Sequence, residues 1–234
     1  MTAGIGRVAV IIPVFNERAS LPLVVAAIPR ARVDEIVVVD NGSTDGTDAI
    51  ARGLPVGLVP EARRGYGRAC LAGVEALARR PPDVLVFLDG DFSDHPEELP
   101  LLLAEIEGGA DLVIGSRMLG AREPGALLPQ ARFGNALACL LIRLISGHRY
   151  TDLGPFRAIR WSAYRRLGMS DTNFGWTCEM QVKALQKGLR VSEVPVSYRR
   201  RVGISKITGT VAGTLKAGWK ILWTIARYGL ARGR

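Results

Sequence analysis

The chain has 234 residues, a length that suits one domain of ordinary size with or without a short appendage. Hydrophobic residues make up 48% of it, alongside 27 Gly and 13 Pro, and this composition excludes a disordered or collagen-like protein. Nine of the 31 Lys and Arg residues, and no acid, lie in residues 195–234, which leaves 22 basic and 22 acidic residues before them. The net charge of +9 therefore belongs to the tail, and the rest of the chain is neutral.

The three cysteines, Cys70, Cys139 and Cys178, lie far apart and form no CxxC or zinc-binding spacing. An odd, scattered set of this kind is typical of reduced thiols in a cytosolic protein. No apolar run has the form of a signal peptide or reaches the about 18 uncharged residues that a spanning helix needs. We therefore expect a cytoplasmic protein without a transmembrane segment.

In chain order, short apolar runs rich in β-branched residues alternate with segments of helical periodicity. The expected strands are residues 8–14, 35–40, 56–59, 84–89 and 112–116. The expected helices between and after them are residues 21–28, 47–52, 69–79 and 97–107. The near-continuous hydrophobicity of the strands indicates burial on both faces, as in a parallel sheet covered by helices. The pattern predicts an α/β fold with a doubly wound, mostly parallel open sheet, whose ligands bind outside the carboxyl ends of the strands.

The second half continues with a Gly- and Pro-containing loop at residues 120–130, which is long enough to act as a lid. Beyond it we expect a helix at 131–146, a loop through Asp152 to residue 155, a helix at 176–187, a strand within 190–199 and a final helix in the tail. The sequence contains no internal repeat and no low-complexity segment.

Polar clusters follow four of the expected strands: Asn16-Glu17, Asp40-Asn41-Gly42-Ser43, Asp89-Gly90-Asp91 and Ser116-Arg117. The turn after the first strand contains no glycine, so the Gly-rich fingerprint of dinucleotide-binding domains is missing there. A Walker A loop and a G-x-S-x-G elbow are absent from the sequence as well, which excludes P-loop NTPases and the common hydrolases.

The sharpest of these features is the pair Asp89 and Asp91 at the end of the run VLVFLDGD. Alternation along an extended chain points both carboxylates the same way. Such a pair suits a hard divalent cation, Mg²⁺ or Mn²⁺, that also takes oxygens from a substrate diphosphate. The alternative is a solvated turn in which Ser93 and Asp94 cap the following helix. Similarly, Asp40 either accepts a hydrogen bond from a ribose hydroxyl or a base, or forms an Asx-turn.

Six segments stand in a fixed order along the chain: IIPVFNE, EIVVVDNGSTDGT, LDGDFSDHPEEL, IGSR, TDLGPFRAIR and YRRRVGISKITG. In this order they strongly resemble the motifs of the family 2 glycosyltransferases of the GT-A fold. Within that family the chain looks most like the polyprenyl-phosphate (dolichyl-phosphate) mannose and glucose synthases. The resemblance covers nearly the whole chain and implies a Rossmann-like GT-A domain with Mg²⁺ or Mn²⁺ as its cofactor.

The resemblance also implies how the first strand ends bind the nucleotide-sugar donor. Pro13, Phe15 and Glu17 would frame the nucleobase. Asp40 would read the base or the ribose. One position departs from the mannose synthases, because Ser93 stands where those enzymes place a Gln near the metal.

The resemblance assigns the later motifs to the metal and to phosphate groups. Asp89 and Asp91 would hold the metal on the donor diphosphate, with Gly90 between them in the same substrate-binding turn, and Asp91 is expected to be catalytic. The residues expected to bind phosphate are Arg117, Arg201 and Lys206. A second departure lies at residues 153–157, where LGPFR replaces the usual Pro-Thr-Ser-Gly-Phe-Arg run and leaves the sugar and the acceptor open.

The chemistry of the acceptor decides whether a general base is needed. A phosphate oxygen is already anionic at neutral pH, so a polyprenyl phosphate needs cations that position it rather than a group that deprotonates it. The candidate positioning groups are Arg132, Asn135, Arg201 and Lys206. Asp152 is expected either to shape the acceptor side or, with an alcohol acceptor, to act as the base. The alternative for Asp152 is a cap before a Gly-Pro turn.

The basic tail is predicted to form an amphipathic helix. At about 100° per residue, Lys216, Lys220 and Arg227 fall within an arc of about 40°, beside an apolar face that includes Trp219 and Trp223. This arrangement is typical of a helix that binds a membrane surface. The alternative is a final helix packed on the core. A nucleic-acid partner is not expected, because the tail lacks interleaved Gly and aromatic residues and nothing resembles a recognition helix.

Together these features predict a catalytic domain over residues 1–206 and the amphipathic helix over residues 207–234. The expected protein is an inverting, metal-dependent hexosyltransferase that uses GDP-mannose, UDP-glucose or another nucleotide sugar. Its expected acceptor is a polyprenyl phosphate, reached from the cytoplasmic face of the membrane. The alternatives are transfer to a hydroxyl acceptor and a nucleotide-sugar-binding protein without catalysis. A membrane-protein subunit or a homo-oligomer is also compatible with the sequence.

Overall fold

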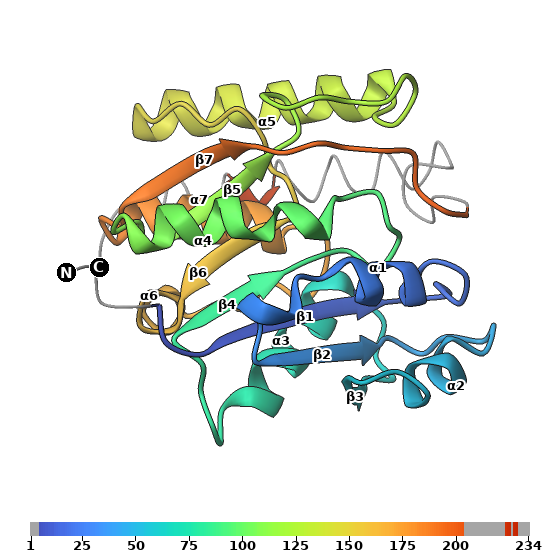
Figure 1. The fold of residues 1–234 in the computed structure, drawn as a ribbon. Helices are drawn as coiled ribbons and strands as arrows, with labels where there is room; N and C mark the ends of the chain where they lie inside the picture. Colours follow the sequence, from blue (N-terminus) through green and yellow to red (C-terminus); the bar gives the residue numbers. More distant parts are fainter. Residues whose placement is uncertain (1–4, 204–222, 226, 229–234) are drawn as a thin grey trace.

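The computed structural model describes residues 5–203, 223–225 and 227–228 and is built around a seven-stranded open sheet (Figure 1). The strands are β1 (Val8–Val14), β2 (Glu35–Asp40), β3 (Gly57–Pro60), β4 (Val84–Phe87), β5 (Leu112–Ser116), β6 (Arg157–Arg160) and β7 (Val191–Pro195). Their order across the sheet is β3-β2-β1-β4-β6-β5-β7. All neighbouring strands run parallel except β6, which is antiparallel to both β4 and β5. The structure therefore confirms the mostly parallel α/β sheet.

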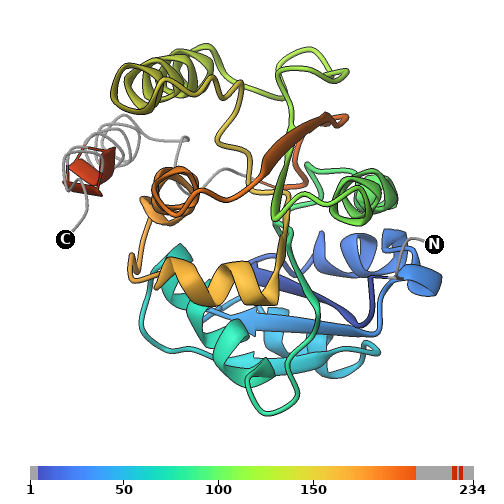
Figure 2. The same ribbon diagram turned by 90° about the vertical axis from the view of Figure 1, so that its left-hand side faces the viewer.

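Helices cover both faces of this sheet (Figure 2). They are α1 (Leu21–Ala27), α2 (Thr47–Arg52), α3 (Tyr66–Leu77), α4 (Leu99–Glu107), α5 (Pro129–Ser146), α6 (Trp161–Leu167) and α7 (Trp176–Gln186). Two short 3-10 helices lie at Arg30–Arg32 and Pro96–Glu98. Apolar side chains of α3, α5, α6 and α7 belong to one core cluster, whereas those of α1, α2 and α4 belong to another.

The alternation of side chains along β1 shows how the sheet separates the two cores. Ala9 and Ile11 are part of the cluster that includes α3 and α7, whereas Val10 and Ile12 are part of the cluster that includes α1 and α4. These four side chains are fully buried. Because successive side chains of a strand point to opposite faces, a strand buried on both faces must be apolar throughout. The continuous run at residues 8–14 satisfies this requirement.

Strand β6 and helix α6 were not expected from the sequence. The four residues of β6, RAIR, include two arginines, so neither a continuous apolar run nor a regular alternation marks them as a strand. Arg157 is nevertheless fully buried, because its guanidinium donates hydrogen bonds to the carbonyl oxygens of Leu153, Gly154 and Thr177. The register pairs Leu112 of β5 with Ile159 of β6, which places β6 between β5 and β4.

Only a short part of the expected tail helix falls within the described residues. Residues 223–225 and 227–228 are helical, and Ile225 is buried in the core cluster that includes α7. The ring of Tyr228 lies 4.7 Å from the ammonium of Lys183 on α7, and its hydroxyl is hydrogen-bonded to Ser170. Lys206 lies outside the described residues. The same is true of the predicted 207–234 helix apart from residues 223–225 and 227–228. Among the helices within the described part of the chain, none is long and apolar enough to cross a bilayer.

Candidate active site

A pocket of about 390 Å³ opens at the carboxyl ends of β1 and β4. The strand order reverses at this place, because β2 lies on one side of β1 and β4 lies on the other. Ligands of doubly wound sheets bind at such points. Its lining residues come from segments far apart in the sequence and are Pro13, Val14, Phe15, Glu17, Asn41, Arg64, Gly65, Tyr66, Ala69, Asp89, Gly90, Asp91, Asn173, Phe174 and Arg201.

The pocket brings together one group of the residues expected from the sequence and leaves another group out. The expected residues that line it are Pro13, Phe15, Glu17, Asp89, Gly90, Asp91 and Arg201. Those that do not line it are Asp40, Arg117, Arg132, Asn135 and Asp152. The loops after β1 and β4 therefore meet a cation from the segment that follows β7.

The two carboxylates after β4 occupy different environments. Asp91 Oδ1 accepts hydrogen bonds from the amide and the hydroxyl of Ser93, at 2.9 and 2.5 Å, and its Oδ2 lies 3.0 Å from the guanidinium of Arg201. Asp89 is only partly buried as a residue, but its Oδ1 is inaccessible to solvent and has no hydrogen-bond partner among the described residues. Burial, together with the negative charge of Asp91, raises the pKa of Asp89 to about 7.

This arrangement fits a divalent cation that is shared with a substrate. An inaccessible carboxylate oxygen without a hydrogen-bond partner, two residues from a second carboxylate, is an unfavourable place for a negative charge unless a cation binds it. Within the described residues no group of three or more His, Cys, Asp or Glu side chains is arranged to hold a metal by itself. Mg²⁺ and Mn²⁺ commonly bind through one or two carboxylates and complete their coordination with water and substrate phosphates.

The backbone of this turn is constrained by close packing. A Cβ atom at Gly90 would lie 2.6 Å from Cγ1 of Val14, so only glycine fits beneath the pocket at this position. Phe92 has a φ of 62°, in the left-handed region that bulky residues rarely adopt. Asp94 is buried, neither of its carboxylate oxygens has a hydrogen-bond partner among the described residues, and burial raises its pKa well above the usual range. Neither Ser93 nor Asp94 forms the expected side-chain cap on the 3-10 helix at residues 96–98.

Arg201 links the first and the fourth strand ends electrostatically. Its guanidinium lies 3.2 Å from Oε1 of Glu17, whose Oε2 accepts a hydrogen bond from the hydroxyl of Ser20, and 3.0 Å from Oδ2 of Asp91. The segment that carries it is fastened to the Asp91 turn by two backbone hydrogen bonds, from the amides of Arg199 and Val202. A cation from the segment after β7 therefore neutralises two acids of the pocket, one after β1 and one after β4.

The opposite wall of the pocket contains residues that the sequence reading missed. The Arg64 guanidinium carbon lies 3.5 Å from the centroid of the Phe15 ring, which gives this wall a cation–π pair. Asn41 fixes the loop before Arg64, since its amide donates to the carbonyl oxygens of Glu61 and Arg63. Asn173 and Phe174 had no signal, because only the tertiary structure brings their loop to the pocket.

Asp40 is not among the residues that line the pocket. Its carboxylate accepts hydrogen bonds at 3.2 and 3.3 Å from the backbone amide of Ser43, three residues further on, rather than from the amide two residues on that an Asx-turn would use. It thereby shapes the turn at the end of β2, from which Asn41 reaches the pocket wall. A contact between Asp40 and a donor ribose or base stays a prediction.

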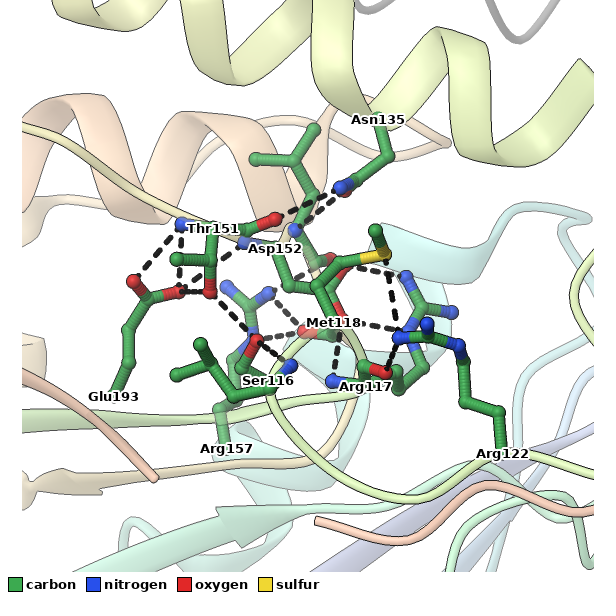
Figure 3. Close-up of polar contacts among 12 residues, drawn as sticks. Ser116, Arg117, Met118, Arg122, Asn135, Thr151, Asp152, Arg157 and Glu193 are labelled. Atoms are coloured by element: carbon green, nitrogen blue, oxygen red, sulfur yellow. Dashed lines mark hydrogen bonds and ion pairs between the residues drawn. The ribbon is translucent and has the colours of Figure 1, made fainter. Parts of the chain in front are cut away.

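A second polar cluster joins the end of β5 to the loop before β6 (Figure 3). Arg117 donates to both carboxylate oxygens of Asp152, through Nε at 2.8 Å and Nη2 at 2.7 Å, and its backbone amide donates to the same carboxylate. Asp152 is fully buried, and only 13% of the Arg117 side chain is exposed. Burial acts to lower the pKa of Arg117, but the charge of Asp152 and its hydrogen bonds outweigh burial and raise that pKa above its usual value.

The loop that carries Asp152 is held from three sides. Asn135 of α5 donates to the carbonyl oxygen of Thr151 and accepts from the amide of Leu153. Glu193 of β7 accepts from the amide and the hydroxyl of Thr151, as Figure 3 shows, and Gln181 of α7 donates to the Asp152 carbonyl oxygen. Asn135 and Asp152 therefore fix the architecture beside the pocket, whereas Arg132 is exposed on the same helix as Asn135.

Comparison with known proteins agrees with this picture. Residues 9–168 match the family model described as glycosyl transferase family 2. The polyprenol monophosphomannose synthase of Mycolicibacterium smegmatis is 34% identical over a region that covers 87% of this chain and 82% of its own. The undecaprenyl-phosphate mannosyltransferase of Micrococcus luteus is 34% identical over 96% of this chain and 95% of its own.

A solved structure shares the architecture. Glucosyl-3-phosphoglycerate synthase from Mycobacterium tuberculosis, in complex with Mn²⁺, uridine diphosphate and phosphoglyceric acid, matches with a TM-score of 0.77 at 20% identity, over 96% of this chain and 79% of that one. At this identity the likeness bears on the fold alone. It confirms the GT-A fold that the sequence motifs imply.

Proposed function

The chain belongs to glycosyl transferase family 2, and on this premise we propose that it transfers a hexose from a nucleotide sugar to a polyprenyl phosphate at the cytoplasmic face of a membrane. The observation that carries the proposal is the pocket in which Asp89, Asp91 and Arg201 converge. The names of the two 34%-identical relatives support the acceptor class, since both describe mannose transfer to a polyprenol-type lipid phosphate. GDP-mannose is accordingly the first donor to test, followed by UDP-glucose.

In this proposal the pocket residues bind the donor from its two ends. Pro13 and Phe15 form an apolar wall for the nucleobase, and Glu17 lies beside them with Arg201. Asp89 and Asp91 would hold a divalent cation, which supplies charge stabilisation to the leaving diphosphate. Arg201 adds a second positive charge at the same place, and a phosphate competes with Glu17 and Asp91 for its guanidinium.

The reaction needs no proton transfer when the acceptor is a phosphate. An anionic phosphate oxygen attacks the anomeric carbon from the face opposite the leaving group, a new carbon–oxygen bond forms, and the electron pair of the broken bond stays on the nucleoside diphosphate. The structure offers a physical reason to favour this acceptor over an alcohol. Asp152, the candidate base for an alcohol, is fully buried and has both carboxylate oxygens bound to Arg117.

The decisive experiment is product formation with purified protein. Polyprenyl phosphate, Mn²⁺ or Mg²⁺ and a panel of nucleotide sugars are combined, and the lipid fraction is analysed by mass spectrometry. Asp91→Ala is the test variant, and Asp48→Ala is the matched control, because Asp48 is an exposed acid in a surface ion pair with Arg52. We expect glycosylated lipid phosphate from the wild type and the control, at least a hundredfold less from Asp91→Ala, and loss of product with EDTA.

Other outcomes separate the alternatives. Donor hydrolysis without a lipid product would contradict the polyprenyl-phosphate acceptor and retain the transferase, and a panel of alcohol acceptors would then be tested with Asp152→Asn as the base variant. Donor binding that never leads to turnover with any acceptor would favour a nucleotide-sugar-binding protein. Equal activity of Asp91→Ala and wild type would contradict the assignment of the site.

A further inference from the structure

The loop between α6 and α7 forms part of the pocket wall although it contains neither helix nor strand. It comprises residues 168–175, and we refer to it as the 168–175 loop. Asn173 and Phe174, near its end, line the pocket. Because the polar backbone groups of a loop are not paired with one another as in a helix or sheet, its conformation depends on the groups packed around it. The wall is therefore in place only while those groups hold the loop.

Helix α7 holds the start of the 168–175 loop through a buried carboxylate. Glu179 is fully buried and accepts hydrogen bonds from the backbone amides of Ser170 and Asp171, at 3.0 and 2.7 Å. The ammonium of Lys183 lies 2.6 Å from the same carboxylate and compensates its charge. These contacts fix residues 170 and 171 of the loop, ahead of the two residues that line the pocket.

Helix α3 and the glycine before it contact the middle of the loop. The backbone amide of Arg68 donates to the carbonyl oxygen of Thr172 at 3.0 Å. A Cβ atom at Gly65 would lie 2.1 Å from that same oxygen, and one at Gly67 would lie 2.1 Å from the carbonyl oxygen of Asp171. The two glycines therefore leave the loop backbone the room it needs to approach the pocket.

The described part of the tail is docked on α7. It comprises residues 223–225 and 227–228, which we call the tail segment, and it lies beside α7 (Figure 2). Ile225 is buried in the core cluster that includes α7. The side-chain amide of Gln186 on α7 donates a hydrogen bond to the backbone carbonyl oxygen of Tyr228. An apolar contact and a hydrogen bond thus fasten the tail segment to this helix.

The tail segment also contacts both ends of the 168–175 loop. The hydroxyl of Tyr228 is hydrogen-bonded to that of Ser170 at 2.9 Å. Thr224 is buried, and a Cβ atom at Gly175 would lie 2.2 Å from its hydroxyl oxygen, so these two residues are in close contact. The residues that line the pocket lie between Ser170 and Gly175 in the sequence.

Contacts at both ends of a loop restrict its middle, and loss of these contacts returns conformational freedom to it. A pocket whose wall is in place for only a fraction of the time binds its ligand more weakly by that fraction. Docking of the tail segment therefore contributes to the affinity of the pocket, although the tail segment itself does not line it.

We propose that Thr224 and Tyr228 are positioning residues for the nucleotide-sugar donor. They hold the ends of the 168–175 loop, and the loop keeps Asn173 and Phe174 in the pocket wall. The ligand class rests on the proposed function, but the positioning is independent of the acceptor. Because these residues belong to the basic tail, an event that lifts the tail segment off α7 weakens donor binding.

Calorimetry on the full chain measures this effect, with Mn²⁺, without acceptor, and with GDP or UDP, whichever the wild type binds more tightly. Tyr228→Phe removes the hydroxyl that meets Ser170, and we expect about two- to fivefold weaker binding. Ile225→Asp places a charge in the core contact and should lift the tail segment, with roughly tenfold weaker binding or more. Urea unfolding confirms that each variant is folded under the conditions of the titration.

Each variant has a matched control that should bind the nucleotide as the wild type does. Tyr150→Phe also removes a hydroxyl that is hydrogen-bonded to α7, but its partner is the carbonyl oxygen of Gln181 rather than the 168–175 loop. Trp223→Asp introduces the same carboxylate as Ile225→Asp, at a position of the tail segment that is 52% exposed. Differences between variant and control therefore report on the loop contact and on docking.

A double-mutant cycle separates positioning from general destabilisation. With Asn173→Ala and Phe174→Ala combined, the loop no longer offers these side chains to the nucleotide, so adding Tyr228→Phe should have no further effect on affinity. A merely structural role of Tyr228 would lower stability and leave the affinity of the folded protein unchanged. Hydrogen exchange gives a direct readout, because the amides of residues 168–175 should exchange roughly tenfold faster in Ile225→Asp than in the wild type.

Several results would overturn the proposal. Wild-type affinity of both Tyr228→Phe and Ile225→Asp would do so, and so would an equal loss in Trp223→Asp. An effect of Tyr228→Phe that persists beside Asn173→Ala and Phe174→Ala would show that the tail segment acts by another route. A wild type that binds neither nucleotide would contradict both this proposal and the donor site. Nucleotide binding without a lipid product would contradict the polyprenyl-phosphate acceptor alone, so the two failures are distinguishable.

Discussion

Replacing Asp89 by Asn is expected to stabilise the metal-free protein while it abolishes transfer. The pKa of Asp89 is raised from 3.8 to about 7, chiefly by burial and then by the charge of Asp91. One pKa unit corresponds to about 1.4 kcal/mol, so ionising this group inside the folded protein costs up to about 4 kcal/mol. Because Asp89 is partly exposed, solvent screening reduces the cost, and we expect about 2 kcal/mol.

The sign of the pH dependence follows from the direction of the shift. A carboxyl group whose pKa is higher in the folded than in the unfolded protein keeps its proton longer in the folded state. The contribution of Asp89 to the stability of the metal-free wild type therefore decreases as the pH rises from about 4 to about 7, and its full cost is present above pH 7. Asparagine carries no charge at any of these pH values, so Asp89→Asn should lack this decrease.

Urea unfolding in EDTA at pH 5 and pH 8 measures the effect. Asp89→Asn should unfold at a higher urea concentration than the wild type at pH 8 and by less than half of that margin at pH 5, whereas the exposed control Asp48→Asn should match the wild type at both. Added Mn²⁺ should stabilise the wild type and leave Asp89→Asn unchanged. A variant that is less stable than the wild type at pH 8, or a difference that does not depend on pH, would refute this reasoning.

Three further predictions concern the packing around the site. Asp152→Asn leaves the buried guanidinium of Arg117 without its counter-charge, so the free energy of unfolding should fall by about 3–5 kcal/mol in urea titrations; a loss below about 1 kcal/mol would contradict the buried pair. Gly90→Ala places a methyl group against Val14 and should cost about 1–3 kcal/mol by the same measurement, with weaker donor binding in calorimetry; unchanged stability would show that the turn relaxes freely. Burial raises the pKa of Cys139 to about 12, so thiol reagents at pH 8 should react only as the protein unfolds, and fast reaction of the folded protein would contradict the buried position.

Several features of the site could be read from the sequence because they depend on local chemistry. A strand that ends in Asp89-Gly90-Asp91 places two carboxylates on one side of an extended chain, whatever surrounds it. The pocket does contain this turn, together with Phe15 and Arg201. The partners of each group could not be read in this way. Phe15 meets the guanidinium of Arg64 only because the loop after β3 turns back over the end of β1.

Asp152 shows the limit of the local reading most clearly. In the sequence it is a carboxylate in a loop before Gly-Pro, compatible with a base, an acceptor contact or a cap. In the fold it is fully buried, and Arg117 on another strand end binds both of its oxygens. A single side chain has the same chemistry in all of these settings, and its role depends on which groups surround it and whether water reaches it.

The sequence by itself determined the α/β class, the strands at residues 8–14, 35–40 and 112–116, and the polar strand ends. It could do so because hydrophobic periodicity and strand-end chemistry are properties of neighbouring residues. Only the tertiary structure decided the insertion of β6 between β4 and β5, because the buried Arg157 and the partly buried Arg160 donate hydrogen bonds to the carbonyl oxygens of Thr177 and Ala110, which are distant in the sequence. It also decided which helix face remains outside: α5 is apolar on both sides, and packing on the core buries one side and leaves Phe133 and Leu144 exposed.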